Sequence, residues 1–243
     1  MSVKLASIKK EYSLTKNFLA KKNIFGITKF TTLDFQNHLA CIFWFAKCNM
    51  RCSYCYNADI VHGEGTLSNK EVLDFLKTRI GKLDGVVLSG GECTLSPDII
   101  ELCEEIKELN FKIKIDTNGL NPNLLKELID FSLVDFIALD YKAPANKFQE
   151  ITKNNHIEKF YKTLDMLIEK KFPFETRTTV HPDLLDENDI NAIINDLKIR
   201  KYSGTYYIQN YLHVDSTIET LSKPTRVLNT SLLSKSIPIE YRN

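Results

Sequence analysis

The sequence lacks the features that mark membrane-spanning, secreted or nucleic-acid-binding chains. It has no apolar run of about eighteen residues that would span a bilayer. The first residues, Met1–Ser7, lack the apolar core of a signal peptide. The net charge is only +1, so no overall field favours nucleic acid or a membrane surface. We therefore expect neither nucleic acid nor a membrane among the partners.

The sequence also lacks a Gly/Ser linker, a low-complexity tract or a break in composition. Hydrophobic residues make up 43% of the 243 positions and charged residues 26%, which is typical of a globular protein. We expect a single domain. A basic N-terminal arm would cover residues 1–26 and the main fold residues 27–221. The tail, residues 222–243, would include an added edge strand near 237–241.

Cysteine is present but is not distributed like a disulfide framework. Of the six cysteines, Cys48, Cys52 and Cys55 fall in one short loop. The other three (Cys41, Cys93 and Cys103) lie in or beside apolar segments, where a free cysteine is commonly a small buried hydrophobe. This pattern predicts a reducing compartment, the cytoplasm.

The cysteine loop can bind metal in more than one way. Three thiolates can hold three corners of an iron–sulfur cube, which normally takes four, so that one iron stays open to a small molecule. A Cys₃His zinc site with His62 or His38 is an alternative, as are ordinary buried or reactive thiols. The loop alone leaves these readings open.

Strands and helices alternate along most of the chain. A β-branched segment, 27–35, leads through a turn into an apolar strand, 39–45, and the two form a hairpin. Ser68 then begins a helix as its N-cap, with Glu71 at the capping-box position. Further strands are expected at 85–89, 111–117, 135–141, 174–180 and 205–211, with helices near 96–109, 122–131, 157–171 and 187–200. Such alternation implies a parallel sheet, and six units fit a partial (β/α)₆ TIM-like barrel.

Polar groups follow the expected strands, where the chemistry of such barrels gathers. Gly90 and Gly91 would let a ligand approach the backbone, and Glu92 could hold an amine. Asp116 and Asp140 come at two further strand ends.

Each of these groups also has an ordinary explanation as a turn or a surface charge. A charged residue inside a strand, Arg177, would point inward and need an anionic partner. A structural zinc site explains none of these strand-end groups.

These residues together resemble a known family. Cys48-x₃-Cys52-x₂-Cys55 with Tyr54 before the last cysteine, followed by Gly90-Gly91-Glu92, resembles the radical S-adenosylmethionine (SAM) superfamily. The segments 31–35, 89–92, 116–119, 135–144 and 177–180 further resemble the activating proteins of anaerobic ribonucleoside-triphosphate reductase, and more broadly the glycyl-radical-enzyme activases.

The resemblance implies roles for individual residues. Cys48, Cys52 and Cys55 would ligate three irons of one [4Fe–4S] cluster, and SAM would chelate the fourth. The other implied SAM-binding residues are Tyr54 near the adenine, Gly90, Gly91 and Glu92 at the methionine amine, and Asp116, Thr117, Asn118, Asp140, Lys142 and Arg177. Asp116 and Asp140, with Thr117 and the Ala138 carbonyl, would also hold a monovalent cation.

The implied activity is reductive cleavage of SAM to a 5′-deoxyadenosyl radical that installs a glycyl radical on a partner enzyme. A low-potential flavodoxin or ferredoxin would supply the electron. Cys93 departs from the family pattern, which has proline there. The alternatives are a radical SAM enzyme acting on a small molecule, similar to 7-carboxy-7-deazaguanine synthase, and a non-catalytic metal-binding scaffold.

Overall fold

The fold is built on one curved sheet. The computed structural model describes residues 16–214 and 216–242, and in them nine strands follow the order β3-β1-β2-β4-β5-β6-β7-β8-β9. From β2 to β9 all neighbours are parallel, whereas β1 runs antiparallel to both β2 and β3. The strands are β1 (Lys22–Thr31), β2 (Ala40–Phe45), β3 (Leu67–Ser68), β4 (Gly85–Gly90), β5 (Lys112–Thr117), β6 (Phe136–Asp140), β7 (Phe174–Val180), β8 (Tyr206–Asn210) and β9 (Ile239–Arg242).

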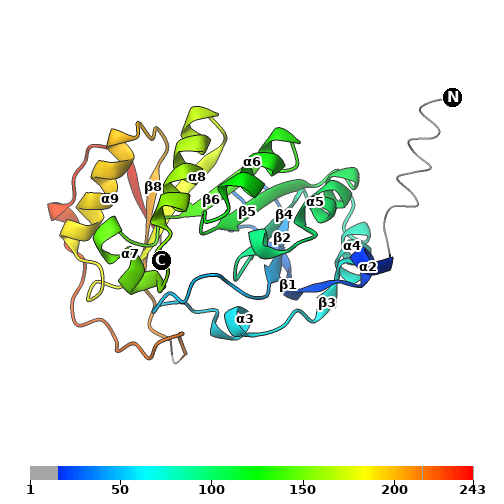
Figure 1. Cartoon of the computed structure of the whole chain (residues 1–243), viewed down its shortest axis with the longest axis horizontal. Coiled ribbons are helices and arrows are strands. Elements are labelled where there is room, and N and C mark those ends of the chain that lie inside the picture. The colour runs from blue at the N-terminus through cyan, green and yellow to red at the C-terminus, as the bar shows by residue number, and fades with distance from the viewer. Residues whose placement is uncertain (1–15, 215, 243) are drawn as a thin grey trace.

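Helices cover the outer face of this sheet. Figure 1 shows α4, α5, α6, α8 and α9 along one side of the strands, with α3 on the other side. The helices are α2 (Lys16–Ala20), α3 (Ala58–His62), α4 (Asn69–Lys77), α5 (Ile99–Glu108), α6 (Pro122–Asp130), α7 (Ala145–Thr152), α8 (Ile157–Glu169) and α9 (Glu187–Ile199), with short 3₁₀ turns at Cys93–Leu95 and Thr230–Leu232. The architecture is the predicted partial (β/α) barrel.

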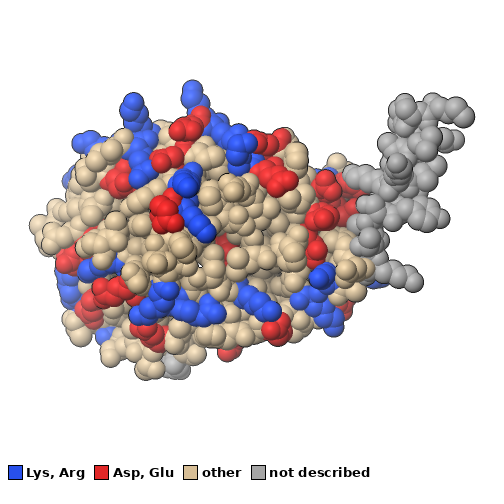
Figure 2. Space-filling model, viewed as in Figure 1, with Lys and Arg blue, Asp and Glu red and all other residues tan. Residues whose placement is uncertain are grey.

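The core lies between the sheet and the helices. Val86 and Leu88 of β4, Ile113 of β5 and Leu102 of α5 have no more than 1% of their surface exposed. Burial of such side chains is the main favourable contribution to folding. Charges of both signs are interspersed over the surface shown in Figure 2.

The N-terminal boundary differs from the prediction. Residues 1–15 of the expected arm lie outside the described residues, but residues 22–26 belong to β1 rather than to the arm. Ile24 is fully buried and pairs with Phe45, so packing extends the strand backwards. The expected strand residues 32–35 lie instead in the turn of the hairpin.

Two local features predicted from the sequence are present in the structure. Ser68 caps α4 in the predicted capping box with Glu71. The tail supplies an edge strand, β9, beside β8, as expected. Among the described residues no helix is long and apolar enough to cross a membrane.

Candidate active site

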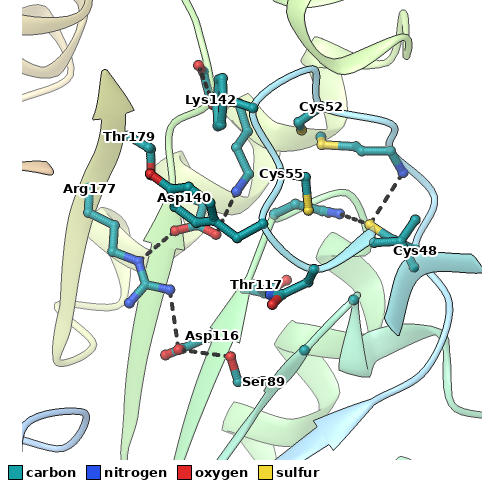
Figure 3. A pocket seen from close by; sticks show the side chains of 18 of the residues that line it. Cys48, Cys52, Cys55, Ser89, Asp116, Thr117, Asp140, Lys142, Arg177 and Thr179 are labelled. Atoms are coloured by element: carbon teal, nitrogen blue, oxygen red, sulfur yellow. Dashed lines mark hydrogen bonds and ion pairs between the residues drawn. The ribbon is translucent and has the colours of Figure 1, made fainter. Parts of the chain in front are cut away.

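A pocket of about 400 Å³ opens where the parallel strands end. The cysteine loop borders it on one side, and Asp116, Asp140 and Arg177 face it from the sheet (Figure 3). Most of the residues that the sequence singled out line it: Cys48, Cys52, Tyr54, Cys55, Gly90, Gly91, Asp116, Thr117, Asn118, Asp140, Lys142 and Arg177. The exceptions are Glu92 and Ala138.

The cysteine loop is held from two directions by backbone hydrogen bonds. The N–H groups of Arg51 and Ser53 donate to the last carbonyls of α7, Thr152 O at 2.8 Å and Ile151 O at 3.1 Å. These bonds satisfy carbonyl groups that a helix end leaves unpaired. Helix α7, which was not predicted, therefore positions the loop.

The second support comes from the segment after β8. Residues 211–214 and 216–222, which we call the strap, lie against the loop. Ile218 N donates to Cys55 O and Glu219 N to Ser53 O, both at 3.2 Å. Lys153, just beyond α7, joins Glu219 at 2.8 Å and so links the two supports.

The three loop thiols suit a metal cluster. Cys52 is buried and Cys48 and Cys55 are half-buried, and Cys48 Sγ lies 3.4 Å from Met50 N and 3.8 Å from Asn118 Nδ2, both N–H donors. Burial raises the pKa of the Cys48 thiol to about 11 and that of Cys52 to about 12. Metal ligation must therefore displace protons from these thiols. N–H groups directed at sulfur stabilise thiolates once formed and tune a cluster.

Neither histidine considered for a zinc site reaches this pocket's walls. His38 stacks on Phe35 with ring centres 4.2 Å apart, in a different pocket, and His62 is exposed at the end of α3. In residues 16–214 and 216–242 no three His, Cys, Asp or Glu side chains are arranged to hold a single metal ion. The corners of an iron–sulfur cube are further apart, so this observation concerns single-ion sites only. Cys41, Cys93 and Cys103 are buried free thiols, as predicted.

The two glycines at the end of β4 are needed for close packing of backbone. A Cβ on Gly90, which has φ +113°, would lie 2.5 Å from Phe45 N, and one on Gly91 would lie 2.0 Å from Lys47 O. Gly91 N donates to Phe45 O at 2.8 Å. The two glycines therefore allow the backbone at the end of β4 to pack closely against the backbone at the start of the cysteine loop, and they also line the pocket.

Glu92 points into the protein rather than into the pocket. Its carboxylate accepts hydrogen bonds from both N and Oγ1 of Thr94, from Thr117 Oγ1 and from Asn118 N. It is 1% exposed, and burial raises its pKa despite these donors. Glu92 therefore fixes the Thr117–Asn118 turn and does not line the pocket.

The expected anionic partners of Arg177 are Asp116 and Asp140. Its Nε lies 2.6 Å from Asp140 Oδ1 and its Nη2 3.2 Å from Asp116 Oδ2 (Figure 3). Lys142 Nζ bonds Asp140 Oδ2 at 2.8 Å. Burial opposes ionisation of Asp140, but Arg177 and Lys142 outweigh it and lower its pKa to about 2. The pocket floor is thus a buried ionic network.

Tyr54 anchors the loop to this network. Its hydroxyl donates to the Lys142 carbonyl at 3.1 Å and the ring is 3% exposed. Burial raises its pKa well above the ordinary value, so the phenol stays neutral.

Sequence reasoning missed several lining residues. Asp34, Trp44, Tyr56, Asn57, Val61, Thr179, Gln209 and Asn210 also line the pocket. The polar end of β8 and the segment before the cysteine strand were visible in the sequence, but nothing in their pattern marked them as lining this pocket. Tyr56 additionally stacks on Tyr211, with ring centres 5.4 Å apart, which ties the chain after the cysteines to the strap.

The chain is similar to known proteins along most of its length. The family model described as the radical SAM superfamily matches residues 42–197. A protein of Methanocaldococcus jannaschii named "Putative glycyl-radical enzyme activating enzyme MJ1227" is 34% identical over 84% of this chain and 85% of its own length. A second protein from that organism with the same description, MJ1632, is 28% identical over 80% of this chain and 74% of its own length.

Solved structures share the fold at low sequence identity. Streptococcus suis SuiB has a TM-score of 0.65 and 17% identity over 82% of this chain and 47% of its own. The enzyme anSMEcpe with bound AdoMet has a TM-score of 0.57 and 18% identity over 69% of this chain and 49% of its own. This chain thus spans about half the length of these solved chains.

Proposed function

The chain belongs to the radical SAM superfamily, and from this premise we propose that it installs a glycyl radical on anaerobic ribonucleoside-triphosphate reductase or a related enzyme. The similarity to MJ1227 over most of both chains carries the proposal, because that relative is named for glycyl-radical activation. The open pocket at the strand ends supports it, since a substrate carbon must lie close to the radical source.

The cofactors are a [4Fe–4S] cluster and SAM, which together supply a 5′-deoxyadenosyl radical when the cluster is reduced. We propose that Cys48, Cys52 and Cys55 ligate the cluster, which fits a loop that carries three thiols on one pocket wall. A low-potential flavodoxin or ferredoxin is the proposed electron donor. The protein's part is to bind, orient and exclude water.

Three charged side chains are proposed to hold the amino-acid part of SAM. Arg177 and Lys142 supply positive charge for its carboxylate, and Asp140 orients both cations. We propose that the backbone of Gly90 and Gly91, which line the pocket, accepts hydrogen bonds from the methionine amine.

Two further groups complete the proposed SAM site. The Thr117–Asn118 turn, fixed by Glu92, closes the pocket near Cys48, and Tyr54 would lie near the adenine. A monovalent cation beside Asp116 stays a prediction. The guanidinium of Arg177 lies between the two aspartates and already supplies positive charge there.

The test is a radical-transfer assay. Anaerobically prepared, reduced protein is mixed with SAM and candidate glycyl-radical enzymes, and electron paramagnetic resonance is recorded. We expect a glycine-centred doublet on one partner. Cleavage of SAM with no radical on any of these partners would instead indicate a radical SAM enzyme acting on a small molecule.

A further inference from the structure

One side of the active-site pocket carries uncharged polar side chains that the proposed SAM site does not use. Asn57, Thr179 and Gln209 line the pocket and are half-buried. Within the described part of the chain, none of these three side chains has a hydrogen-bond partner. The charged groups on the pocket floor, by contrast, bond one another. The hydrogen-bonding groups of the three uncharged side chains are therefore available to a ligand.

Thr179 and Gln209 lie side by side near the ends of two neighbouring strands. They are register partners of β7 and β8, so both side chains lie on the same face of the sheet. Thr179 comes two residues after Arg177, and both project from β7 toward the pocket (Figure 3). Because the parallel strands end at the pocket mouth, Thr179 and Gln209 lie nearer that mouth than the ion pair of Arg177 does.

Asn57 reaches the same side of the pocket from the chain after the cysteines. The ring of its neighbour Tyr56 stacks on Tyr211, with ring centres 5.4 Å apart, and the Tyr56 hydroxyl accepts a hydrogen bond from Leu212 N at 2.7 Å. These contacts hold the segment 56–57 beside the chain that leaves β8. We call the three uncharged side chains the neutral wall: Asn57, Thr179 and Gln209.

The charges of the pocket disfavour an anionic substrate. Among the described residues that line it, three are carboxylates (Asp34, Asp116 and Asp140) and two are cations (Lys142 and Arg177). Both cations already bond Asp140, at 2.8 and 2.6 Å. A phosphate or carboxylate substrate needs positive charge that is not compensated in this way. Since the same two cations are proposed to hold the SAM carboxylate, the pocket favours an uncharged substrate.

The neutral wall matches the groups of a polypeptide backbone. A peptide group offers one N–H donor and one C=O acceptor. The carboxamides of Asn57 and Gln209 both donate and accept, and so does the hydroxyl of Thr179. A substrate without such groups would exclude water and leave the wall unpaired, which weakens its binding. A target glycine has no side chain, so its recognition at the reacting carbon depends on backbone groups.

We propose that the neutral wall binds the peptide groups beside the target glycine and positions its Cα for the radical reaction. The substrate is then an uncharged, extended polypeptide segment. The inference rests on the proposed glycyl-radical activity. Productive transfer moves one hydrogen atom from the glycine Cα to the 5′-deoxyadenosyl radical, so one 5′-deoxyadenosine forms for each glycyl radical. A misplaced glycine lets SAM be cleaved without this transfer.

The test uses Gln209→Leu and Thr179→Val, which remove hydrogen-bonding groups with little change in size. Gln149→Leu makes the same chemical change at an exposed position of α7, outside the pocket, and is the control. Two quantities are measured with a glycyl-radical enzyme that the unsubstituted protein activates. They are the amount of 5′-deoxyadenosine formed per glycyl radical, and the SAM affinity of the cluster-loaded protein by calorimetry.

We expect the 5′-deoxyadenosine formed per glycyl radical to rise about tenfold in Gln209→Leu and in Thr179→Val, because a hydrogen bond that positions the substrate is lost. The SAM affinity of both variants should equal that of the unsubstituted protein, which also shows that the pocket is folded. Gln149→Leu should match the unsubstituted protein in both measurements.

An unchanged ratio in both variants would overturn the neutral wall as a substrate site while leaving the proposed function intact. Weaker SAM binding with an unchanged ratio at saturating SAM would assign these side chains to the cofactor and also overturn the inference. If the unsubstituted protein activates no glycyl-radical enzyme, the proposed function fails, and the polypeptide substrate of the neutral wall fails with it.

Discussion

Arg177 Nε donates to Asp140 Oδ1 at 2.6 Å, joining the neighbouring strands β6 and β7 inside the barrel. The side chains are only 15% and 21% exposed. A charge at this depth is tolerated because its partner compensates the loss of water. The pair therefore contributes to the fold as well as to the proposed SAM site.

Arg177→Ala should leave buried carboxylates uncompensated and destabilise the protein by about 3 kcal/mol. Arg177→Lys keeps the positive charge but cannot bond both Asp140 and Asp116 as the guanidinium does, so it should destabilise the protein less than Arg177→Ala. Urea unfolding measures both changes. Adding Asp140→Asn to Arg177→Ala should restore part of the loss, and strict additivity of the two substitutions would show that the residues are not coupled.

Glu92→Gln should destabilise the protein by about 1–3 kcal/mol, because an amide NH₂ would face a backbone donor such as Asn118 N. The displaced Asn118 should also weaken SAM binding, measured by calorimetry on the cluster-loaded protein. Glu101→Gln, on the exposed side of α5, is the control and should change neither. Normal SAM affinity in Glu92→Gln would show that the turn is held by other contacts.

The strap is expected to protect the cluster loop. Ile218→Pro removes the N–H that donates to Cys55 O, whereas Ile218→Ala keeps it. Without this hydrogen bond the closed strap would be less stable by about 1 kcal/mol, which raises the population of the open strap about fivefold. Iron should therefore be lost faster in air. Iron release timed with a chelator gives the measurement. Equal rates for the two variants would mean that the backbone bond does not limit opening.

Much of the fold could be predicted from local signals, but the supports of the loop could not. Apolar strands such as 86–88 and the Ser68 cap depend on residues that are neighbours in the sequence, so their pattern predicts them. A charged residue inside a strand, Arg177, already required an acidic partner. By contrast, contacts such as Ile218 with Cys55 join distant backbone groups, which leave no pattern in side-chain type.

The sequence also did not predict helix α7 or the orientation of the Glu92 side chain. The helix is short and follows Pro144, so its segment resembled a loop. The Gly-Gly-Glu run marks a strand end, but whether the carboxylate faces a ligand or Thr94 and Asn118 depends on the turn of the next strand.

The C-terminal tail should stabilise the folded protein at neutral pH by a contribution that is lost at low pH. Arg226 Nη2 bonds both oxygens of Glu187 at 2.6 Å, and with Asn229 N it lowers the pKa of Glu187 to about 2. A carboxyl whose pKa is lower in the folded state stabilises above its unfolded pKa of about 4.3, and this contribution disappears as the pH falls towards the folded value.

Glu187→Gln should therefore be less stable than the unsubstituted protein at about pH 7, with a difference that shrinks as the pH falls below about 4. Arg226→Gln should behave similarly, because it removes the main cause of the shift. Chemical unfolding at several pH values measures this. A difference that stays constant with pH would assign the loss to packing rather than to the charge.

The central claim is that Cys48, Cys52 and Cys55 hold one four-iron cluster with an open site for SAM, and metal and sulfide analysis of anaerobically prepared protein tests it most directly. We predict about four irons and about four sulfides per chain, both lost in Cys52→Ala, with an electron paramagnetic resonance signal of the reduced cluster that changes when SAM is added. One zinc per chain without sulfide, or a full cluster in Cys52→Ala, would contradict the account.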